Sequence, residues 1–314
     1  MKNLIIFGAG ASYGSGRVLF GNTYNGFIDK VPALGNKLFY ELQCFDSNGW
    51  GKLNGLIAKE FEDDFEKAMD KLFSSDSYNI MPLQRSMASY FFRFQPTSNN
   101  LYYQLAKLIF KKQWNGALIT LNYERLLETS LNNMGISTGY YSTPPKFDIN
   151  GSPMIELCVP HGTCHIFCPA IEGGGNMKFD ACSVVSIGHV ELVNKQEEFD
   201  EKIKDGLPPV MSYFIPSKKT TSGVDFIDEQ RKRYKDLVTE ADNIAIIGLK
   251  VREHDTHIWE SLKISTAKLI YCSGADGAEE FNEWISKHRA GKNDVALRGF
   301  FKESFDELCL HVQL

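Results

Sequence analysis

The chain has 314 residues, of which 43% are hydrophobic and 23% charged, and it carries a formal net charge of -5. This length and composition predict a globular protein of one large domain or two smaller ones. The acidic balance disfavours direct nucleic-acid binding, because nucleic-acid-binding surfaces are usually basic. We expect no membrane contact, because no apolar run is long enough to span a bilayer. Seven irregularly spaced cysteines fit reduced thiols in a cytoplasmic protein rather than a disulfide framework.

The N-terminal stretch carries the first functional signal. Leu4-Ile5-Ile6-Phe7 predicts a buried parallel strand, and the turn that follows has glycine at positions 8, 10, 14 and 16. A helix starting just after Gly10 would turn free N–H groups toward a phosphate, with Ser12 as a cap or a hydroxyl donor. A branched side chain at Gly10 should then block that phosphate and leave the fold intact. The alternative is an ordinary strand–turn–helix without a ligand. Tyr13 stands where the dinucleotide fingerprint has its third glycine, which disfavours an ordinary dehydrogenase.

The next hundred residues predict mostly helices. Residues 17–32 resemble a loop, and apolar residues at helical spacing predict helices over 34–42, 56–73, 81–94 and 99–112. We therefore expect residues 17–112 to form an inserted helical subdomain.

From residue 113 onward, strand and helix patterns alternate. The expected strands are 117–121, 154–159, 183–187, 209–214, 243–249, 267–272 and 295–301. The expected helices are 123–134, 195–205, 225–241, 255–264, 276–289 and 303–309. Such alternation predicts an α/β protein with a Rossmann-like parallel sheet and helices on both faces, built from residues 1–16 plus 113–314.

Two polar residues follow predicted strands and are candidates for chemistry. Asn122 ends one strand and His161 the next, so both should reach the crevice beyond the carboxyl edge of the sheet. Each has an ordinary explanation: Asn122 as a helix N-cap, and His161 as a structural histidine. In combination, they would supply an orienting amide and a titratable base.

Three short motifs together resemble the sirtuin (SIR2) superfamily, and most closely the SIR2-like domains of bacterial anti-phage defence proteins. They are Gly8-Ala9-Gly10-Ala11-Ser12 with Ser15-Gly16, then Thr120-Leu121-Asn122-Tyr123-Glu124, then His161-Gly162-Thr163. Ile246-Ile247-Gly248-Leu249 followed by Asp255 is similar to a late segment of that family, and Pro32-Ala33-Leu34-Gly35 and the 62–69 helix add weak matches.

The resemblance implies an NAD-binding domain. By analogy, Gly8, Ala9, Gly10, Ala11 and Ser12 would cradle the pyrophosphate of NAD, and Asn122 and His161 would flank the nicotinamide ribose. The other positions that the analogy assigns to NAD binding are Thr120, Glu124, Gly248, Leu249 and Ser273.

The chain departs from the deacylase sirtuins in three ways. Arg17-Val18-Leu19-Phe20 replaces their proline–aspartate–phenylalanine–arginine run, and Leu121 replaces a glutamine. No CxxC pair occurs; Cys158, Cys164, His165, Cys168 and Cys182 lie close in sequence without the spacing typical of zinc sites, so we expect no metal. The alternative for these cysteines is burial as small hydrophobic residues.

These departures favour hydrolysis of NAD itself. The predicted function is an NAD+ glycohydrolase, which releases nicotinamide and ADP-ribose and depletes NAD in anti-phage defence. The alternatives are an NAD-dependent deacylase or ADP-ribosyltransferase, and an inactive NAD- or ADP-ribose-binding regulator. A toxic NADase needs a trigger, so we expect a homo-oligomer, a partner defence protein, or both.

Overall fold

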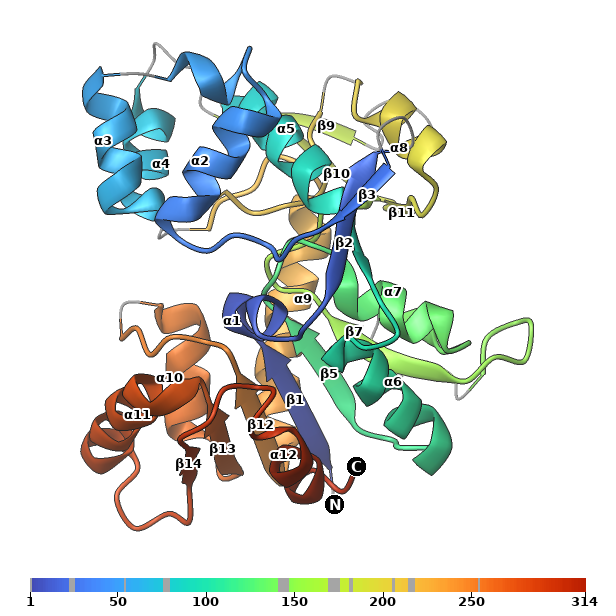
Figure 1. Ribbon diagram of the computed structural model, residues 1–314, viewed down its shortest axis with the longest axis vertical. Coiled ribbons are helices and arrows are strands. Elements are labelled where there is room, and N and C mark those ends of the chain that lie inside the picture. The colour runs from blue at the N-terminus through green and yellow to red at the C-terminus, as the bar shows by residue number, and fades with distance from the viewer. Residues whose placement is uncertain are drawn as a thin grey trace.

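The computed structural model describes residues 2–22, 26–53, 55–75, 80–140, 147–168, 176–180, 183–204, 207–213, 218–253 and 255–314 (Figure 1). The strands are β1 (Asn3–Phe7), β2 (Val18–Asn22), β3 (Gly26–Asp29), β4 (Phe94–Pro96), β5 (Ala117–Thr120), β6 (Ser137–Gly139), β7 (Met154–Cys158), β8 (Ile166–Phe167), β9 (Asn176–Asp180), β10 (Ser183–Ile187), β11 (Glu191–Leu192), β12 (Asn243–Ile247), β13 (Lys268–Cys272) and β14 (Val295–Leu297).

The helices are α1 (Ala9–Tyr13), α2 (Asn36–Phe45), α3 (Gly55–Asp63), α4 (Phe65–Ser74), α5 (Ile80–Phe92), α6 (Leu101–Lys112), α7 (Leu126–Asn133), α8 (Gln196–Lys202), α9 (Val224–Glu240), α10 (Thr256–Ile264), α11 (Gly274–His288) and α12 (Phe305–His311), with a 3-10 turn at Trp50–Lys52.

The framework is a seven-stranded sheet in the order β14-β13-β12-β1-β5-β7-β6, and every pairing in it is parallel. The strand β1 lies in the middle, with β5 on one side and β12 on the other. The chain builds outward on the β5 side first and later returns to β12, so the strand order reverses at β1. In open parallel sheets, the crevice at such a reversal is where ligands bind.

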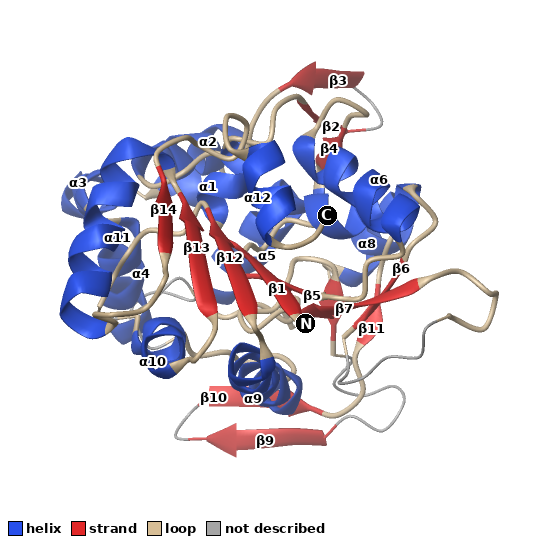
Figure 2. Cartoon of the chain, turned by 90° about the horizontal axis from the view of Figure 1, so that it is seen from below, coloured by secondary structure: helices blue, strands red, loops and turns tan. Residues whose placement is uncertain are grey.

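Both faces of the sheet are covered, as a run of apolar strands requires. Along β1, Ile5 and Phe7 belong to one buried cluster, and Leu4 and Ile6 belong to another. The first cluster includes residues of α1, α6, α7 and α12, and the second includes residues of α9, α10 and α11. Figure 2 shows the sheet with α6 and α12 on one side and α9 and α10 on the other. The predicted α/β class with a helix-flanked parallel sheet is confirmed.

Two loops cross in close contact at the carboxyl ends of β1 and β12. The Gly8 N–H donates to Ile247 O at 2.8 Å, and the Gly10 N–H donates to Gly248 O at 2.9 Å. A Cβ at Gly248 would lie 1.9 Å from Ala11 N, and this glycine has a φ of +63°. A Cβ at Gly10 would lie 2.9 Å from Gly248 O. The expectation that a branched side chain at Gly10 leaves the fold intact is therefore wrong, because the position is closed by backbone.

Several predicted elements differ from the structure in the N-terminal half. Residues 17–32 are not a loop, because β2 pairs with both β3 and β4 in a three-stranded antiparallel sheet. The expected helix 56–73 is two helices, α3 and α4. The break falls at Asp64, whose carboxylate accepts the N–H groups of Glu66 and Lys67 and so starts a new helix.

Other differences lie in the second half. Residues 183–187 form a strand, but it pairs antiparallel with β9 outside the main sheet. Residues 209–213 carry only an isolated bridge from Met211 to Gly162, since two prolines remove backbone donors just before it; residue 214 lies outside the described residues. The helix expected at 123–134 begins at Leu126. The division of the chain into two domains stays a prediction.

The crossing of the two loops predicts a stability defect at Gly248. Replacing Gly248 with alanine forces a side chain into left-handed backbone against Ala11 N, and we expect a loss of about 2–5 kcal/mol in the free energy of unfolding. Urea unfolding measures it. Gly14→Ala is the matched control, since its Cβ would meet only Gly10 O at 3.3 Å, with ordinary φ. Equal stability of the two variants would contradict the crossing.

Candidate functional site

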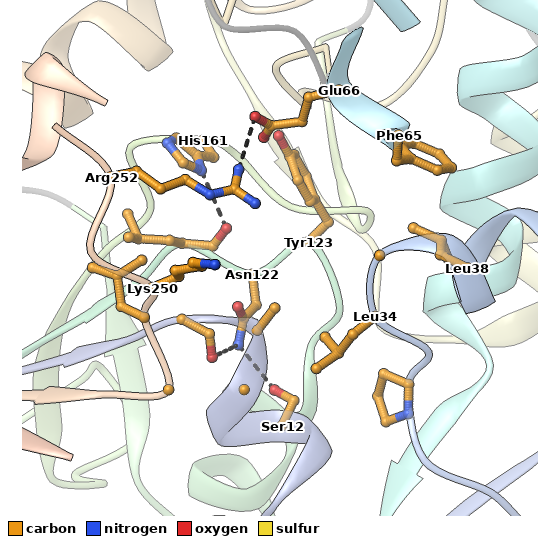
Figure 3. Close-up of a pocket in the computed structure, with 18 of the residues that line it drawn as sticks. Ser12, Leu34, Leu38, Phe65, Glu66, Asn122, Tyr123, His161, Lys250 and Arg252 are labelled. Atoms are coloured by element: carbon orange, nitrogen blue, oxygen red, sulfur yellow. Dashed lines mark hydrogen bonds and ion pairs between the residues drawn. The ribbon is translucent and has the colours of Figure 1, made fainter. Parts of the chain in front are cut away.

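A cavity of about 550 Å³ lies between the carboxyl edge of the sheet and the helices α2, α3 and α4. Its floor includes Gly8, Gly10 and Asn122, and its far wall includes Leu34, Leu38 and Phe65. Figure 3 shows Asn122, Leu34, Leu38 and Phe65 around this cavity. A site of this size, part apolar and part polar, suits a cofactor-sized ligand.

Asn122 is held by its amide nitrogen and leaves its amide oxygen unpaired. The side chain is 5% exposed, and Nδ2 donates to Gly8 O at 3.1 Å and to Ser12 Oγ at 2.9 Å. Because Gly8 O can only accept, the amide orientation is fixed. Asn122 Oδ1 is buried without a hydrogen-bond partner among the described residues, and Figure 3 shows it on the side of the amide away from Ser12. This oxygen can accept a hydrogen bond from a ligand hydroxyl or a water molecule. Asn122 is not an N-cap, since α7 begins four residues later.

A buried polar network supports this asparagine from below. Ser12 Oγ hydrogen-bonds to Glu124 Oε1 and lies 2.8 Å from Tyr102 OH. Glu124 Oε2 accepts the Leu126 N–H at 2.6 Å, which starts α7. Burial raises the pKa of Glu124, against the opposing effect of these hydrogen bonds. Ser12 therefore lies inside α1 as part of the network and does not cap it, and both oxygens of Glu124 serve the protein.

His161 is paired with a second histidine that the sequence did not single out. His161 is 7% exposed; its Nδ1 lies 3.2 Å from Leu121 O and its Nε2 lies 2.8 Å from His257 Nε2. A carbonyl oxygen only accepts, so His161 carries its proton on Nδ1. Its Nε2 is then the acceptor, and His257 donates from Nε2. His257 lies in the first turn of α10, so α10 fixes the ring that faces His161.

Both rings are neutral at neutral pH. Burial lowers the pKa of His161 well below its ordinary value, with further contributions from Lys218 and His257. Burial likewise lowers the pKa of His257 to about 4. Both histidines are therefore built to exchange hydrogen bonds rather than to hold a positive charge.

The backbone amides of the glycine turn are largely used within the protein. Gly8, Gly10 and Ala11 donate their N–H groups to Ile247, Gly248 and Gly8 carbonyls. The helix α1 begins at Ala9, two residues earlier than expected. Ala9 is exposed at the cavity, and no hydrogen bond described for the structure uses its N–H. The expected phosphate-binding turn with several free N–H groups is therefore not present as predicted; of Gly8, Ala9, Gly10 and Ala11, Ala9 is the residue whose N–H is available to a ligand.

A cluster of ion pairs joins the helix α4, on one side of the cavity, to Lys218 and Arg252 on the other. Glu66, in the first turn of α4, lies 2.6 Å from Lys218 Nζ and 3.1 Å from Arg252 Nη1. The Lys218 side chain is 7% exposed and that of Arg252 is 40% exposed. Figure 3 shows the Arg252 arm of this contact. Glu66 falls within the weakly matching 62–69 stretch, whereas no sequence signal pointed to Lys218, Arg252 or His257.

Most of the predicted site residues border this cavity. They are Gly8, Ala9, Gly10, Ser12, Asn122, Glu124, His161, Gly248, Leu249 and Ser273. Ala11 and Thr120 are not at its surface: Ala11 is 0% exposed, and Thr120 is 1% exposed with Oγ1 accepting the Asn122 N–H at 3.1 Å. The roles assigned to these residues in NAD binding and catalysis stay predictions.

No group of three or more histidine, cysteine, aspartate or glutamate side chains suited to a metal ion occurs within the part of the chain that the structure describes. Cys158, Cys164 and Cys168 are buried and form no disulfide with another described cysteine, and Cys182 lies outside the described residues. A search of the described helices for one long and apolar enough to cross a bilayer found none.

Comparisons with known proteins return structural likeness alone. No protein-family model matches the chain, and no curated protein matches it. Among solved structures, it is similar to mutant Sir2 homologues in complex with ADP-ribose. One is 19% identical, with a TM-score of 0.45, and a second is 18% identical, with a TM-score of 0.44; each match covers 99% of this chain and 92% of that one. Another similar structure is a Sir2 in complex with an inhibitor, 2′-O-acetyl-ADP-ribose and a deacetylated p53 peptide. It is 15% identical, covers 87% of this chain and 81% of that one, and has a TM-score of 0.38. At this similarity, no residue role transfers to the chain.

The neutral histidines predict a loss of stability in mild acid. A histidine whose folded pKa is depressed binds its proton in the unfolded state first, so stability is complete above the unfolded value near 6.5 and falls below it. We expect the free energy of unfolding to drop between about pH 6.5 and 4, by up to about 1.4 kcal/mol per pH unit for each histidine. His257→Asn should flatten this slope in urea unfolding, and the exposed His189→Asn should not. The same slope in both variants would refute the neutral pair.

The cysteine spacing predicts a protein that holds no zinc. Elemental analysis of protein purified without chelator should find well under one zinc per chain, and chelator should leave the melting temperature unchanged. About one zinc per chain with unfolding by chelator would overturn this expectation.

Proposed function

We propose that the chain is an NAD+ glycohydrolase, which hydrolyses NAD+ to nicotinamide and ADP-ribose. The observation that carries the proposal is the meeting of Asn122 and His161 at one cavity with the glycine turn. The cavity volume of about 550 Å³ lies in the range of cofactor sites. The order of the motifs, which resembles the sirtuin superfamily, supports NAD as the ligand.

The reaction breaks one bond and forms one. The bond from the ribose C1′ to the pyridinium nitrogen breaks, and its electron pair leaves with nicotinamide. The sugar passes through an oxocarbenium-like centre. A water oxygen bonds to C1′ and one water proton is released, which balances the reaction.

Asn122 orients the groups around C1′. Its Nδ2 is committed to Gly8 O and Ser12 Oγ, so Oδ1 is the atom that meets the ligand. An acceptor there aligns a water molecule or a ribose hydroxyl whose oxygen faces the developing positive charge. The buried network under Asn122 keeps this oxygen in place and limits the reorganisation that the reaction needs.

His161 supplies a second acceptor. Its Nε2 lone pair receives the His257 N–H in the ligand-free arrangement, so a substrate hydroxyl or water reaches it by replacing His257. The depressed pKa of His161 keeps the lone pair free of a proton at neutral pH. His161 thus polarises the hydroxyl or water, and the released proton passes to solvent rather than staying on this ring.

Cations beside the cavity favour an anionic substrate. Lys250 and Arg252 border it with side chains 65% and 40% exposed, and Lys218 lies deeper. The pyrophosphate of NAD carries the negative charge that such groups attract. Glu66 neutralises part of this charge in the ligand-free protein.

We also propose, from the motif resemblance, that NAD depletion serves anti-phage defence in the cytoplasm and that a homo-oligomer or a partner protein triggers it. Native mass measurement of the protein purified with the products of neighbouring genes tests the trigger. A monomer that is fully active alone would refute this part and leave the NADase proposal standing.

Loss of either polar residue should remove turnover while binding remains. Asn122→Ala and His161→Ala should each lower the rate of nicotinamide release by at least roughly 100-fold, the range found for a positioned catalytic group. Thermal melting checks the fold, because Asn122 also bonds Gly8 and Ser12. The matched controls are the exposed Asn150→Ala and His189→Ala, which should retain the parent rate. A folded His161→Ala variant with the parent rate would refute the mechanism.

The reaction class is tested separately. Incubation of the protein, together with any oligomer or partner that triggers it, with NAD+ as the only substrate should yield nicotinamide and ADP-ribose at equal rates in chromatography. Adding an acetylated peptide should not raise nicotinamide release. Turnover that occurs only with the peptide would favour a deacylase, and NAD+ binding without any turnover would favour a regulatory protein.

A further inference from the structure

A second cavity, of about 450 Å³, lies on another side of the molecule. It is enclosed by the β2–β3–β4 sheet, by α7 and by the segment before α8, which Figure 1 shows on the side away from α10 and α11. None of its lining residues borders the first cavity. Its polar groups are two arginines, Arg93 and Arg125, and a set of side-chain amides.

Arg125 is the deeper arginine, and it forms no ion pair with any carboxylate in the part of the chain that the structure describes. The residue is 7% exposed, and its Nη1 donates to Asn194 O at 3.0 Å. Its guanidinium carbon lies 3.7 Å from the ring centroid of Phe92, which fixes the plane of the group. Among the described residues, Arg125 forms no ion pair or hydrogen bond with a carboxylate, although Glu128 is near enough to favour its charged form, and its buried Nε has no hydrogen-bond partner. A buried guanidinium of this kind is unusual, because buried charges are normally paired.

Arg93 borders the same cavity and is also without an ion pair to any described carboxylate. Its guanidinium carbon lies 5.4 Å from the Phe45 ring centroid. Its Nε is buried and has no hydrogen-bond partner among the described residues. Asp200 is near enough to favour the charged form of Arg93, but Asp200 Oδ1 accepts from Gln196 Nε2 at 2.8 Å. Asp200 is thus near Arg93 without forming an ion pair with it.

Glu128 does not supply the missing negative charge. It lies in α7 near Arg125, yet both of its oxygens are buried without hydrogen-bond partners among the described residues. Burial, with a contribution from Glu124, raises the pKa of Glu128 to about 8, so the carboxyl is mainly protonated at neutral pH. The surplus of positive charge at this cavity remains.

We propose that this second cavity binds the phosphate group of a phosphorylated small molecule of nucleotide size. Planar guanidinium groups held by aromatic rings are pre-organised for two-pronged binding of phosphate oxygens. The amides of Gln95, Asn132 and Asn133 line the same space and offer donors and acceptors for a sugar or base. The volume admits a mononucleotide.

Titration calorimetry with AMP tests the site, with adenosine and inorganic phosphate as separate probes. AMP should bind and adenosine should not, because the phosphate is the group recognised; inorganic phosphate should bind more weakly than AMP. Arg93→Gln and Arg125→Gln should each raise the Kd for AMP at least about tenfold, as loss of a charge-assisted contact does. Arg298→Gln, at a surface arginine paired with Glu279, is the matched control and should not change it.

Hydrogen exchange locates the bound AMP independently of the proposed NADase activity. Protection should appear in α7, over residues 126–133, and should vanish in Arg93→Gln. Arg93 is partly exposed, so that variant carries the test if Arg125→Gln fails to fold. Absence of AMP binding, an unchanged Kd in folded Arg93→Gln, or protection confined to residues 8–13 and 248–252 would each overturn the proposal.

Discussion

The structure depends on the close contact between two loops that follow neighbouring parallel strands. The turn after β1 and the turn after β12 hydrogen-bond through backbone atoms at Gly8, Gly10 and Gly248. No side chain fits between them, so the floor of the cavity is backbone. This contact sets the position of α1, and α1 sets the position of Ser12, to which the Asn122 amide is bonded. The geometry of the candidate site follows from a steric constraint in the sheet.

The polar groups beside the cavity differ in how completely they are hydrogen-bonded within the protein. Ser12 hydrogen-bonds to both Glu124 and Tyr102 in the interior, where an unpaired polar atom costs roughly 1–3 kcal/mol. Asn122 takes part through its nitrogen only, and its oxygen stands at the edge of the network. A folded protein tolerates such an orphan acceptor where a ligand completes it. The network therefore has a part that is satisfied within the protein and, at Asn122 Oδ1, an acceptor without a partner among the described residues.

The sequence was sufficient for the sheet and for the ends of its strands. Buried parallel strands are near-continuous apolar runs, so β1, β5, β7, β12 and β13 were recognisable, and residues just after them had to share one edge. Other strands were missed: β6 has only three residues, and β2 contains a glycine and an asparagine that suggested a loop. The strand β10 was predicted, but its antiparallel pairing outside the main sheet was not. His257, Lys218 and Glu66 were missed because they come from distant segments, and only the fold brings them to one cavity. The two unpaired arginines of the second cavity were missed for the same reason, since a missing counter-ion is a property of three-dimensional surroundings.

The contact between the two histidines has a direction. His161 holds one hydrogen toward Leu121 and receives another from His257, so both of its ring nitrogens are occupied. His257 donates inward from Nε2, which leaves its Nδ1 as the basic atom of the pair. A proton arriving from solvent can settle on Nδ1 without breaking the contact, and the contact then strengthens because the donor is charged. The same proton on His161 Nε2 would require His257 to change to the tautomer that accepts at Nε2. Protonation therefore leaves the present hydrogen bonds unchanged only when it occurs on the His257 ring.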